Sequence, residues 1–206
     1  MSRRITLAAL VVVTVDAALL HFWPGTVELL YGIRMLLGAG ALGVLVLLQV
    51  PRQDLGLTFS AERSEFRLIF RCCLAVPCLY AIPFLLTQIF PTHLGIDFEN
   101  PEGAWRYLWT TLLLAPVAEE IIYRGLVVSA LRETLPNWVV ILASGILFYL
   151  LHLSYGKDWR LFHYIPAGMI LSWAFLHTRK LWVPVLLHFL GNILMGIDDI
   201  VRLLGE

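Results

Sequence analysis

Apolar residues occur in long blocks along the chain, and short polar stretches separate these blocks. Blocks of this length are typical of helices that cross a lipid bilayer, whereas alternating apolar and polar residues would indicate strands. The predicted spans cover residues 5–23, 27–50, 68–90, 105–135, 138–153, 161–177 and 181–204. The pattern predicts an all-α fold, a polytopic membrane helical bundle with about seven transmembrane helices. We expect residues 1–206 to form a single integral-membrane domain.

Three local features refine this prediction. The polar stretch at 60–67 is expected to form a short amphipathic helix at the membrane surface. Asp16 interrupts the first span and is expected to be buried or to face a cavity. The second span contains Gly38, Gly40 and Gly43, which permit close packing of helices.

The composition supports the membrane interpretation. Hydrophobic residues make up 59% of the 206 residues and charged residues 15%, against roughly 45–50% and 25% in a soluble domain. The formal net charge is zero, so nothing indicates a nucleic-acid partner. Cys72, Cys73 and Cys78 share one apolar segment without metal-ligand spacing, and we interpret them as packing residues.

The distribution of charge between the spans predicts the orientation of the chain. Basic residues gather on one side of the predicted bundle, at Arg3, Arg4, the 52–71 region, Arg132, Arg179 and Lys180. The acidic loop at 91–104 and the acidic tail fall on the other side, and Lys157 and Arg160 are the exceptions. Because cytoplasmic loops carry an excess of Lys and Arg, we expect a cytoplasmic amino terminus.

Glu119, Glu120 and Arg124 interrupt the fourth apolar block. A charged residue at the centre of a membrane helix costs roughly 2.5–3.5 kcal/mol and is by default a candidate functional residue. The i,i+4 spacing makes Glu120 the natural ion-pair partner of Arg124, whereas Glu119 points about 100° away around the helix. We therefore expect the Glu119 carboxylate to remain unpaired, to face a cavity and to be the reactive acid.

Two further i,i+4 pairs lie on other spans, Phe148 with His152 and His188 with Asn192. A carboxylate near an imidazole can hold and deprotonate water, and a second imidazole with a carboxamide can stabilise an oxyanion. These groups suffice for hydrolysis of a peptide bond without a covalent intermediate or a cofactor. Alternatively, Asn192 could only link helices by hydrogen bonding, and Phe148 could only pack around the cavity.

A zinc site is another alternative for the same side chains. Glu119, His152 and His188 are ligand types that, with one open position, define a catalytic zinc site. The chain has no HExxH motif, so the spacing does not favour zinc.

The patterns EExxxR at 119–124, FxxxH at 148–152 and HxxxN at 188–192 together resemble a known family. This is the CAAX prenyl endopeptidase and bacteriocin-processing group of intramembrane proteases, called the CPBP or Abi family. The resemblance covers roughly residues 105–192, which we take as the motif-bearing catalytic core, and Leu55-Gly56-Leu57 is also similar to a family feature. It implies a multi-pass fold with a membrane-embedded catalytic cavity.

The resemblance also implies roles for individual residues. Glu119 and His152 would activate water, and His188 with Asn192 would form the oxyanion site. Glu120 and Arg124 would support this geometry. The family is described both as glutamate-type and as metal-dependent.

We therefore expect an intramembrane endopeptidase that acts near the terminus of a membrane-associated protein or peptide. A CAAX-like tail or a C-terminal sorting signal would be the substrate, and the bacterial inner membrane the location. One alternative is a non-catalytic immunity or chaperone-like membrane protein of the same fold. Another is a small transporter with a proton relay, but the inverted repeats expected of transporters are not detectable.

Overall fold

The computed structural model describes residues 2–23, 25–75, 108–156 and 162–195, and all regular structure in these ranges is helical. The order is α1 (Ser2–Phe22), α2 (Val27–Leu47), η1 (Arg52–Leu55), a helix over residues 63–75, η2 (Leu108–Leu114), α5 (Ala115–Glu120), η3 (Ile121–Val128), α6 (Ser129–Leu131), α7 (Asn137–Gly156), α8 (Tyr164–Thr178) and α9 (Trp182–Met195). Each of the seven predicted blocks contains a helix. The predicted all-α fold is confirmed.

Within the described ranges, two helices, α1 and α2, are long and apolar enough to cross a membrane by length and composition. Shorter apolar helices cover Asn137–Leu153 and Trp182–Leu194. The bundle is therefore consistent with a membrane protein. The cytoplasmic amino terminus stays a prediction, and the predictions for Cys78, the loop at 91–104, Lys157 with Arg160, and the acidic tail lie outside the described residues.

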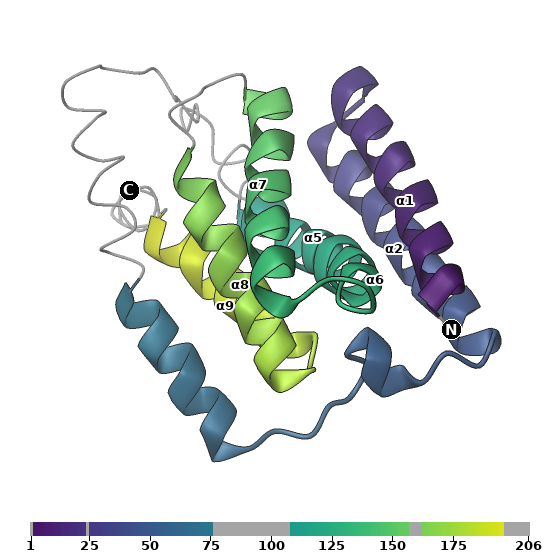
Figure 1. Cartoon of the computed structure of the whole chain (residues 1–206). Helices are drawn as coiled ribbons and strands as arrows, with labels where there is room; N and C mark the ends of the chain where they lie inside the picture. The colour runs from purple at the N-terminus through teal and green to yellow at the C-terminus, as the bar shows by residue number, and fades with distance from the viewer. Residues whose placement is uncertain (1, 24, 76–107, 157–161, 196–206) are drawn as a thin grey trace, which may run out of the picture.

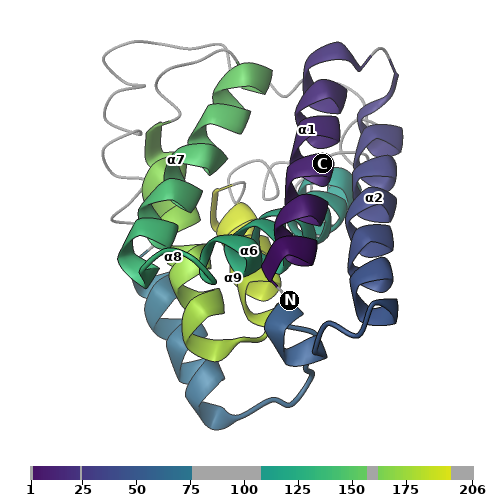
Figure 2. The ribbon, with the colours of Figure 1, turned by 45° about the vertical axis from the view of Figure 1, so that its right-hand side comes forward.

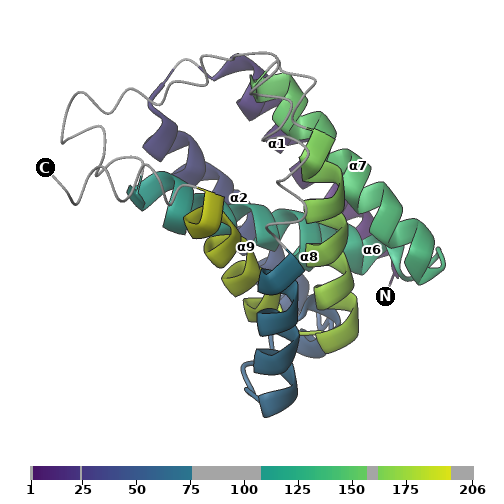
Figure 3. The ribbon, with the colours of Figure 1, turned by 90° about the vertical axis from the view of Figure 1, so that its left-hand side faces the viewer.

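The helices are arranged around a central segment that consists of η2, α5, η3 and α6. In Figure 1, α1 and α2 lie side by side on the right, and α7, α8 and α9 lie on the left. The central segment runs between these two groups and contacts both. Figures 2 and 3 show that it lies across α1 and α2 rather than along them.

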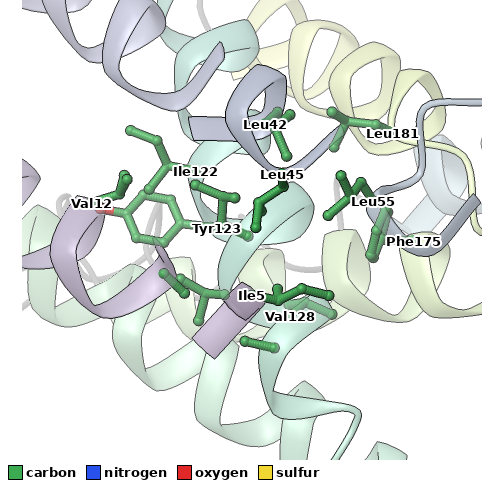
Figure 4. Close-up of a cluster of buried hydrophobic side chains, with 14 of the residues drawn as sticks. Ile5, Val12, Leu42, Leu45, Leu55, Ile122, Tyr123, Val128, Phe175 and Leu181 are labelled. Carbon is green, nitrogen blue, oxygen red and sulfur yellow. The ribbon is translucent and has the colours of Figure 1, made fainter. Parts of the chain in front are cut away.

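The central segment is enclosed by apolar side chains from several helices. All residues from 122 to 130 are buried. The cluster around them draws on α1, α2, η1, η3, α8 and the residues that lead into α9 (Figure 4), and includes Ile5, Val12, Leu42, Leu45, Leu55, Ile122, Tyr123, Val128, Phe175 and Leu181. The two acidic residues just before this buried run, Glu119 and Glu120, are thus next to a part of the chain that is packed on more than one side.

The fourth span is not one regular α-helix. Its first and third parts, η2 and η3, are π-helical, and the six-residue α5 lies between them. Pro116 in α5 has no N–H to donate to the carbonyl one turn earlier, which is a common cause of local widening in a helix. π-Helical turns are rare and frequently occur at functional sites.

The predicted surface helix at 60–67 is wrong as a separate element. The helix begins at residue 63 and continues to 75 without a break, into the described part of the predicted third span. At its start the backbone N–H of Glu62 donates to the Glu65 carboxylate, as in the second half of a capping box. Lys180, in the connection between α8 and α9, also binds Glu65.

Gly56 directly follows η1, in the connection that leads into this helix. Its φ of 73° lies in the left-handed region, and an added Cβ would lie 2.5 Å from the Phe175 ring. Its carbonyl accepts a hydrogen bond from the Leu181 amide at 2.9 Å. The Leu55-Gly56-Leu57 stretch therefore joins the amino-terminal half of the chain to the turn between α8 and α9.

Three glycines in α2 were expected to allow close packing of helices. Gly38 allows it, against the central segment. An added Cβ at Gly38 would lie 2.6 Å from Ile121 Cγ2 and 3.0 Å from Ile122 Cγ1, whereas Gly40 and Gly43 have nothing within 4 Å. Gly38 lies one turn after Arg34, so the same face of α2 meets the central segment at both residues.

Gly38→Ala should lower the free energy of unfolding by about 1–3 kcal/mol, because the methyl group overfills the contact with Ile121. Gly40→Ala, two residues along the same helix, should be neutral or stabilising by up to about 1 kcal/mol, because it only reduces backbone freedom. Thermal unfolding of the detergent-solubilised protein measures both. Equal effects of the two substitutions would contradict this packing.

The Glu65–Lys180 pair should make stability depend on pH. Burial alone would raise the pKa of Glu65, but hydrogen bonds from Lys180 and the Glu62 amide outweigh it and hold this pKa below its usual value. The stabilisation is therefore complete above about pH 4.3, the usual value for Glu, and is lost as the pH falls through the folded-state pKa.

Glu65→Gln should accordingly lower the unfolding temperature at pH 7, and the difference from the parent should shrink below about pH 4. Glu133→Gln replaces an exposed carboxylate and serves as the control, with little effect at either pH. If the difference in unfolding temperature between the parent and Glu65→Gln stays constant over this pH range, the Glu65–Lys180 pair does not cause the pH dependence.

Candidate active site

The adjacent acids Glu119 and Glu120 end α5, and both are buried. Glu120 Oε1 accepts a hydrogen bond from Arg124 Nη1 at 2.9 Å and lies 2.9 Å from His188 Nδ1. Arg124 also donates to the Gly168 carbonyl at 3.2 Å. The ion pair predicted from the i,i+4 spacing is confirmed, and His188 joins it from α9.

Glu119 is not unpaired, so that prediction is wrong. Arg34 Nη1, on α2, lies 3.2 Å from Glu119 Oε1, and Tyr31 OH lies 3.5 Å from the same oxygen. The prediction considered only partners on the helix that carries Glu119. Arg34 is a basic residue within an apolar block, which is the same signal that identified Glu119, and sequence reasoning missed it.

Asp16 holds Arg34 in place. Its two carboxylate oxygens lie 2.6 Å from Arg34 Nε and 3.2 Å from Nη2, a two-point contact that fixes the plane of the guanidinium. Tyr123 OH, on η3, donates to Asp16 Oδ2. Asp16 is fully buried, in agreement with the first of its two predicted environments.

The second oxygen of Glu119 has a different environment. Glu119 Oε2 is buried and, like Glu120 Oε2, has no hydrogen-bond partner among the described residues. His188 contacts the adjacent Glu120, and the Phe148 ring packs against both His152 and His188. The acid and the two imidazoles that the sequence singled out are thus brought into one cluster from α5, α7 and α9.

Both imidazoles have their Nδ1 atoms occupied. His152 Nδ1 lies 2.8 Å from the Phe148 carbonyl, and His188 Nδ1 lies 2.9 Å from the Glu120 carboxylate. Since a carbonyl and a carboxylate only accept, each Nδ1 carries the proton. In the neutral rings Nε2 then has the lone pair, so each Nε2 can bind a proton or a water molecule.

Phe148 packs among these rings. Its centroid lies 4.5 Å from that of His152 and 5.7 Å from that of His188, and Arg124 Cζ lies 4.9 Å above its face. His152 also stacks on Tyr164, at 3.8 Å and 19°. Phe148 therefore separates and orients the polar groups, in line with its predicted packing role.

Asn192 lies one turn after His188 on α9. Its Nδ2 donates to the Thr111 carbonyl of η2 at 2.8 Å, so it links two helices, as the structural alternative expected. The amide nitrogen carries a second hydrogen that could serve an oxyanion. The oxyanion role of Asn192 stays a prediction.

The charges in this cluster do not cancel among the acids and arginines alone. Asp16, Glu119 and Glu120 carry three negative charges and Arg34 and Arg124 two positive charges, which leaves one negative charge when both imidazoles are neutral. One proton on His188, which contacts Glu120, would make the cluster neutral.

The side chains do not fit a zinc site. Among the described residues, no three His, Cys, Asp or Glu side chains form a group that could hold a metal ion. The Arg34 guanidinium, 3.2 Å from Glu119, would also repel a divalent cation at that carboxylate. The set of Glu119, His152 and His188 is therefore unsuited as placed, and no step below passes through a metal.

Comparison with known proteins finds one family model that matches the part of the chain with these motifs. Residues 101–194 match the model of the "Type II CAAX prenyl endopeptidase Rce1-like" family, and this range contains all three motifs. We call residues 101–194 the Rce1-like segment. The resemblance to CAAX prenyl endopeptidases and their CPBP relatives is thereby confirmed for this Rce1-like segment, which does not include Asp16 or Arg34.

Two curated bacterial proteins are similar over part of their length. An "Uncharacterized 24.3 kDa protein" of Escherichia coli is 32% identical over 123 residues, which cover 55% of this chain and 56% of that protein. The "Putative membrane peptidase YdiL" of Bacillus subtilis (strain 168) is 28% identical over 80 residues, 39% of this chain and 32% of that protein. The chain thus spans about half or less of the relatives it matches. No solved structure matches.

Substitution of Glu119 and of Glu120 should lower the free energy of unfolding by different amounts. Glu120→Gln leaves the buried Arg124 without a carboxylate among its contacts and should lower the free energy of unfolding by about 3–5 kcal/mol. Glu119→Gln leaves Arg34 still paired with Asp16, so it should lower the free energy of unfolding by less, about 1–2 kcal/mol. Thermal unfolding in detergent measures the difference. A larger loss for Glu119→Gln would contradict the assigned pairing.

Proposed function

We propose that this chain is an intramembrane endopeptidase that hydrolyses a peptide bond near the end of a membrane-associated protein or peptide. One observation carries the proposal. A buried carboxylate, Glu119, has one oxygen bound to arginine and the other without a hydrogen-bond partner among the described residues, and it adjoins the cluster in which Phe148 packs against His152 and His188. A water molecule held at such an oxygen can be deprotonated.

In the proposed reaction, Glu119 Oε2 and His152 Nε2 hold the nucleophilic water. The water oxygen bonds to the scissile carbonyl carbon, and its proton passes to Glu119. The carbonyl oxygen becomes an oxyanion, which accepts a hydrogen bond from His188 Nε2 in the protonated ring, with Asn192 Nδ2 as a second donor. The C–N bond then breaks, and the proton on Glu119 passes to the leaving amine.

Glu120 and Arg124 act through His188 in this mechanism. The Glu120 carboxylate, 2.9 Å from His188 Nδ1, stabilises the imidazolium that donates to the oxyanion. Arg124 fixes Glu120 and is itself fixed by the Gly168 carbonyl. These residues are positioning residues, because they do not reach the substrate themselves.

The substrate class follows from the family and from the outer surface. The family description names prenylated CAAX tails, which are carboxyl-terminal and held at a membrane. The surface of α1 and α2 exposes large apolar side chains, among them Leu7, Leu10, Leu36 and Leu47. Such a surface suits lipid, and the two bacterial relatives suggest a bacterial inner membrane as the location.

Purified protein in detergent should cleave a quenched fluorescent peptide that ends in a farnesylated CAAX sequence, or its unprenylated counterpart. Glu119→Gln and His152→Ala should each reduce kcat by about 100-fold or more, because each removes a group that activates water. His177→Ala replaces an exposed histidine at the end of α8 and should leave activity unchanged.

Two outcomes would overturn this mechanism. Undiminished cleavage by either Glu119→Gln or His152→Ala would exclude water activation by these groups. Loss of activity with 1,10-phenanthroline and its recovery with Zn²⁺ would show metal dependence instead. If the parent cleaves neither peptide and Glu119→Gln confers the same bacteriocin protection as the parent, the non-catalytic immunity function replaces the proposal.

A further inference from the structure

Asp16 and Arg34 reach the proposed catalytic acid from helices outside the Rce1-like segment. Asp16 is on α1 and Arg34 on α2, and their exposed fractions are 0% and 1%. The guanidinium makes two contacts with Asp16 and a third with Glu119 Oε1. A chain of two ionic contacts thus connects α1, α2 and α5.

The orientation of Arg34 is determined by more groups than a simple ion pair requires. Asp16 binds Nε and Nη2, Tyr123 OH binds Asp16, and the guanidinium carbon lies 4.9 Å from the centroid of the Tyr31 ring. Arginine presents its donors in a rigid fork, so these contacts also fix the direction of Nη1. Nη1 is the atom that reaches Glu119.

Glu119 is therefore bound through one oxygen only. Binding of Oε1 stops the carboxylate from rotating and leaves Oε2 as the oxygen without a protein partner. The same guanidinium supplies the positive charge that a carboxylate in an apolar interior needs to stay ionised. One residue thus sets both the direction and the charge of the base.

We propose that Arg34, held by Asp16, is a positioning residue that directs Oε2 of ionised Glu119 toward the water. This inference rests on the proposed function. It makes the α1–α2 pair part of the active site, although the Rce1-like segment begins after it. A purely structural Asp16–Arg34 pair would hold α1 against α2 without any effect on Glu119.

Arg34→Gln leaves Asp16 as a buried, unpaired carboxylate and could prevent folding. The decisive variant is therefore the double substitution Asp16→Asn with Arg34→Gln, which removes both charges together. Arg34→Lys retains the charge but loses the fork. Arg132→Gln is the matched control, since it removes an arginine that binds Asp54 at 3.1 Å, in a contact separate from the acid cluster.

Activity on the farnesylated peptide is the first measurement. The double variant should remain folded, with kcat lowered by about 10- to 100-fold and KM changed by less than about two-fold. Arg34→Lys should restore part of kcat, and Arg132→Gln should retain the parental value. A purely structural pair would change the unfolding temperature without this separation of kcat from KM.

Carbodiimide labelling is the second measurement, and it needs no substrate. Dicyclohexylcarbodiimide enters apolar sites and modifies protonated carboxyl groups. Glu119 should resist the reagent in the parent and in Arg34→Lys, and should be modified in the double variant, as read by mass spectrometry. Glu120 retains Arg124 in all variants and serves as the internal reference.

The outcomes separate the two hypotheses. If Glu119→Gln is inactive but the double variant keeps parental kcat or leaves Glu119 unlabelled, the positioning role is overturned and the proposed function stands. If Glu119→Gln is fully active, the proposed function falls and the catalytic part of this inference falls with it. Labelling of Glu119 in the double variant alone would then still establish that Arg34 holds it ionised.

Discussion

Compensation of buried charge determines how this bundle is built. Of the four buried carboxylates among the described residues, Asp16, Glu119 and Glu120 have a guanidinium as partner, and Glu65 has Lys180. An unpaired charge in such a place costs several kcal/mol, so the helices that carry these groups must pack in one arrangement. The apolar contacts among α1, α2 and η3 supply the affinity between helices, and the ion pairs specify the register.

The two acids use this compensation differently. Glu120 is surrounded by Arg124 and His188, which makes it a fixed anion in a short chain of polar groups. Glu119 Oε1 is compensated by Arg34 instead, and Oε2 of each acid has no hydrogen-bond partner among the described residues. The difference in partners arises because adjacent residues on a helix face different neighbours, so one packing arrangement places Glu120 against Arg124 and His188 and Glu119 against Arg34.

The sequence predicted those parts of the fold that depend on local patterns. Apolar blocks located seven helices, and the i,i+4 spacing located the Glu120–Arg124 pair. Contacts between distant residues were not accessible, because no local rule relates Arg34 to Glu119, which is 85 residues away.

The position of Asp16 and Arg34 on consecutive helices bears on biosynthesis. The two residues are 18 positions apart and pair within one helical hairpin. Because both charges belong to one hairpin, they can neutralise each other before residue 119 is translated. The third contact, from Arg34 Nη1 to Glu119, requires the central segment and can form only later.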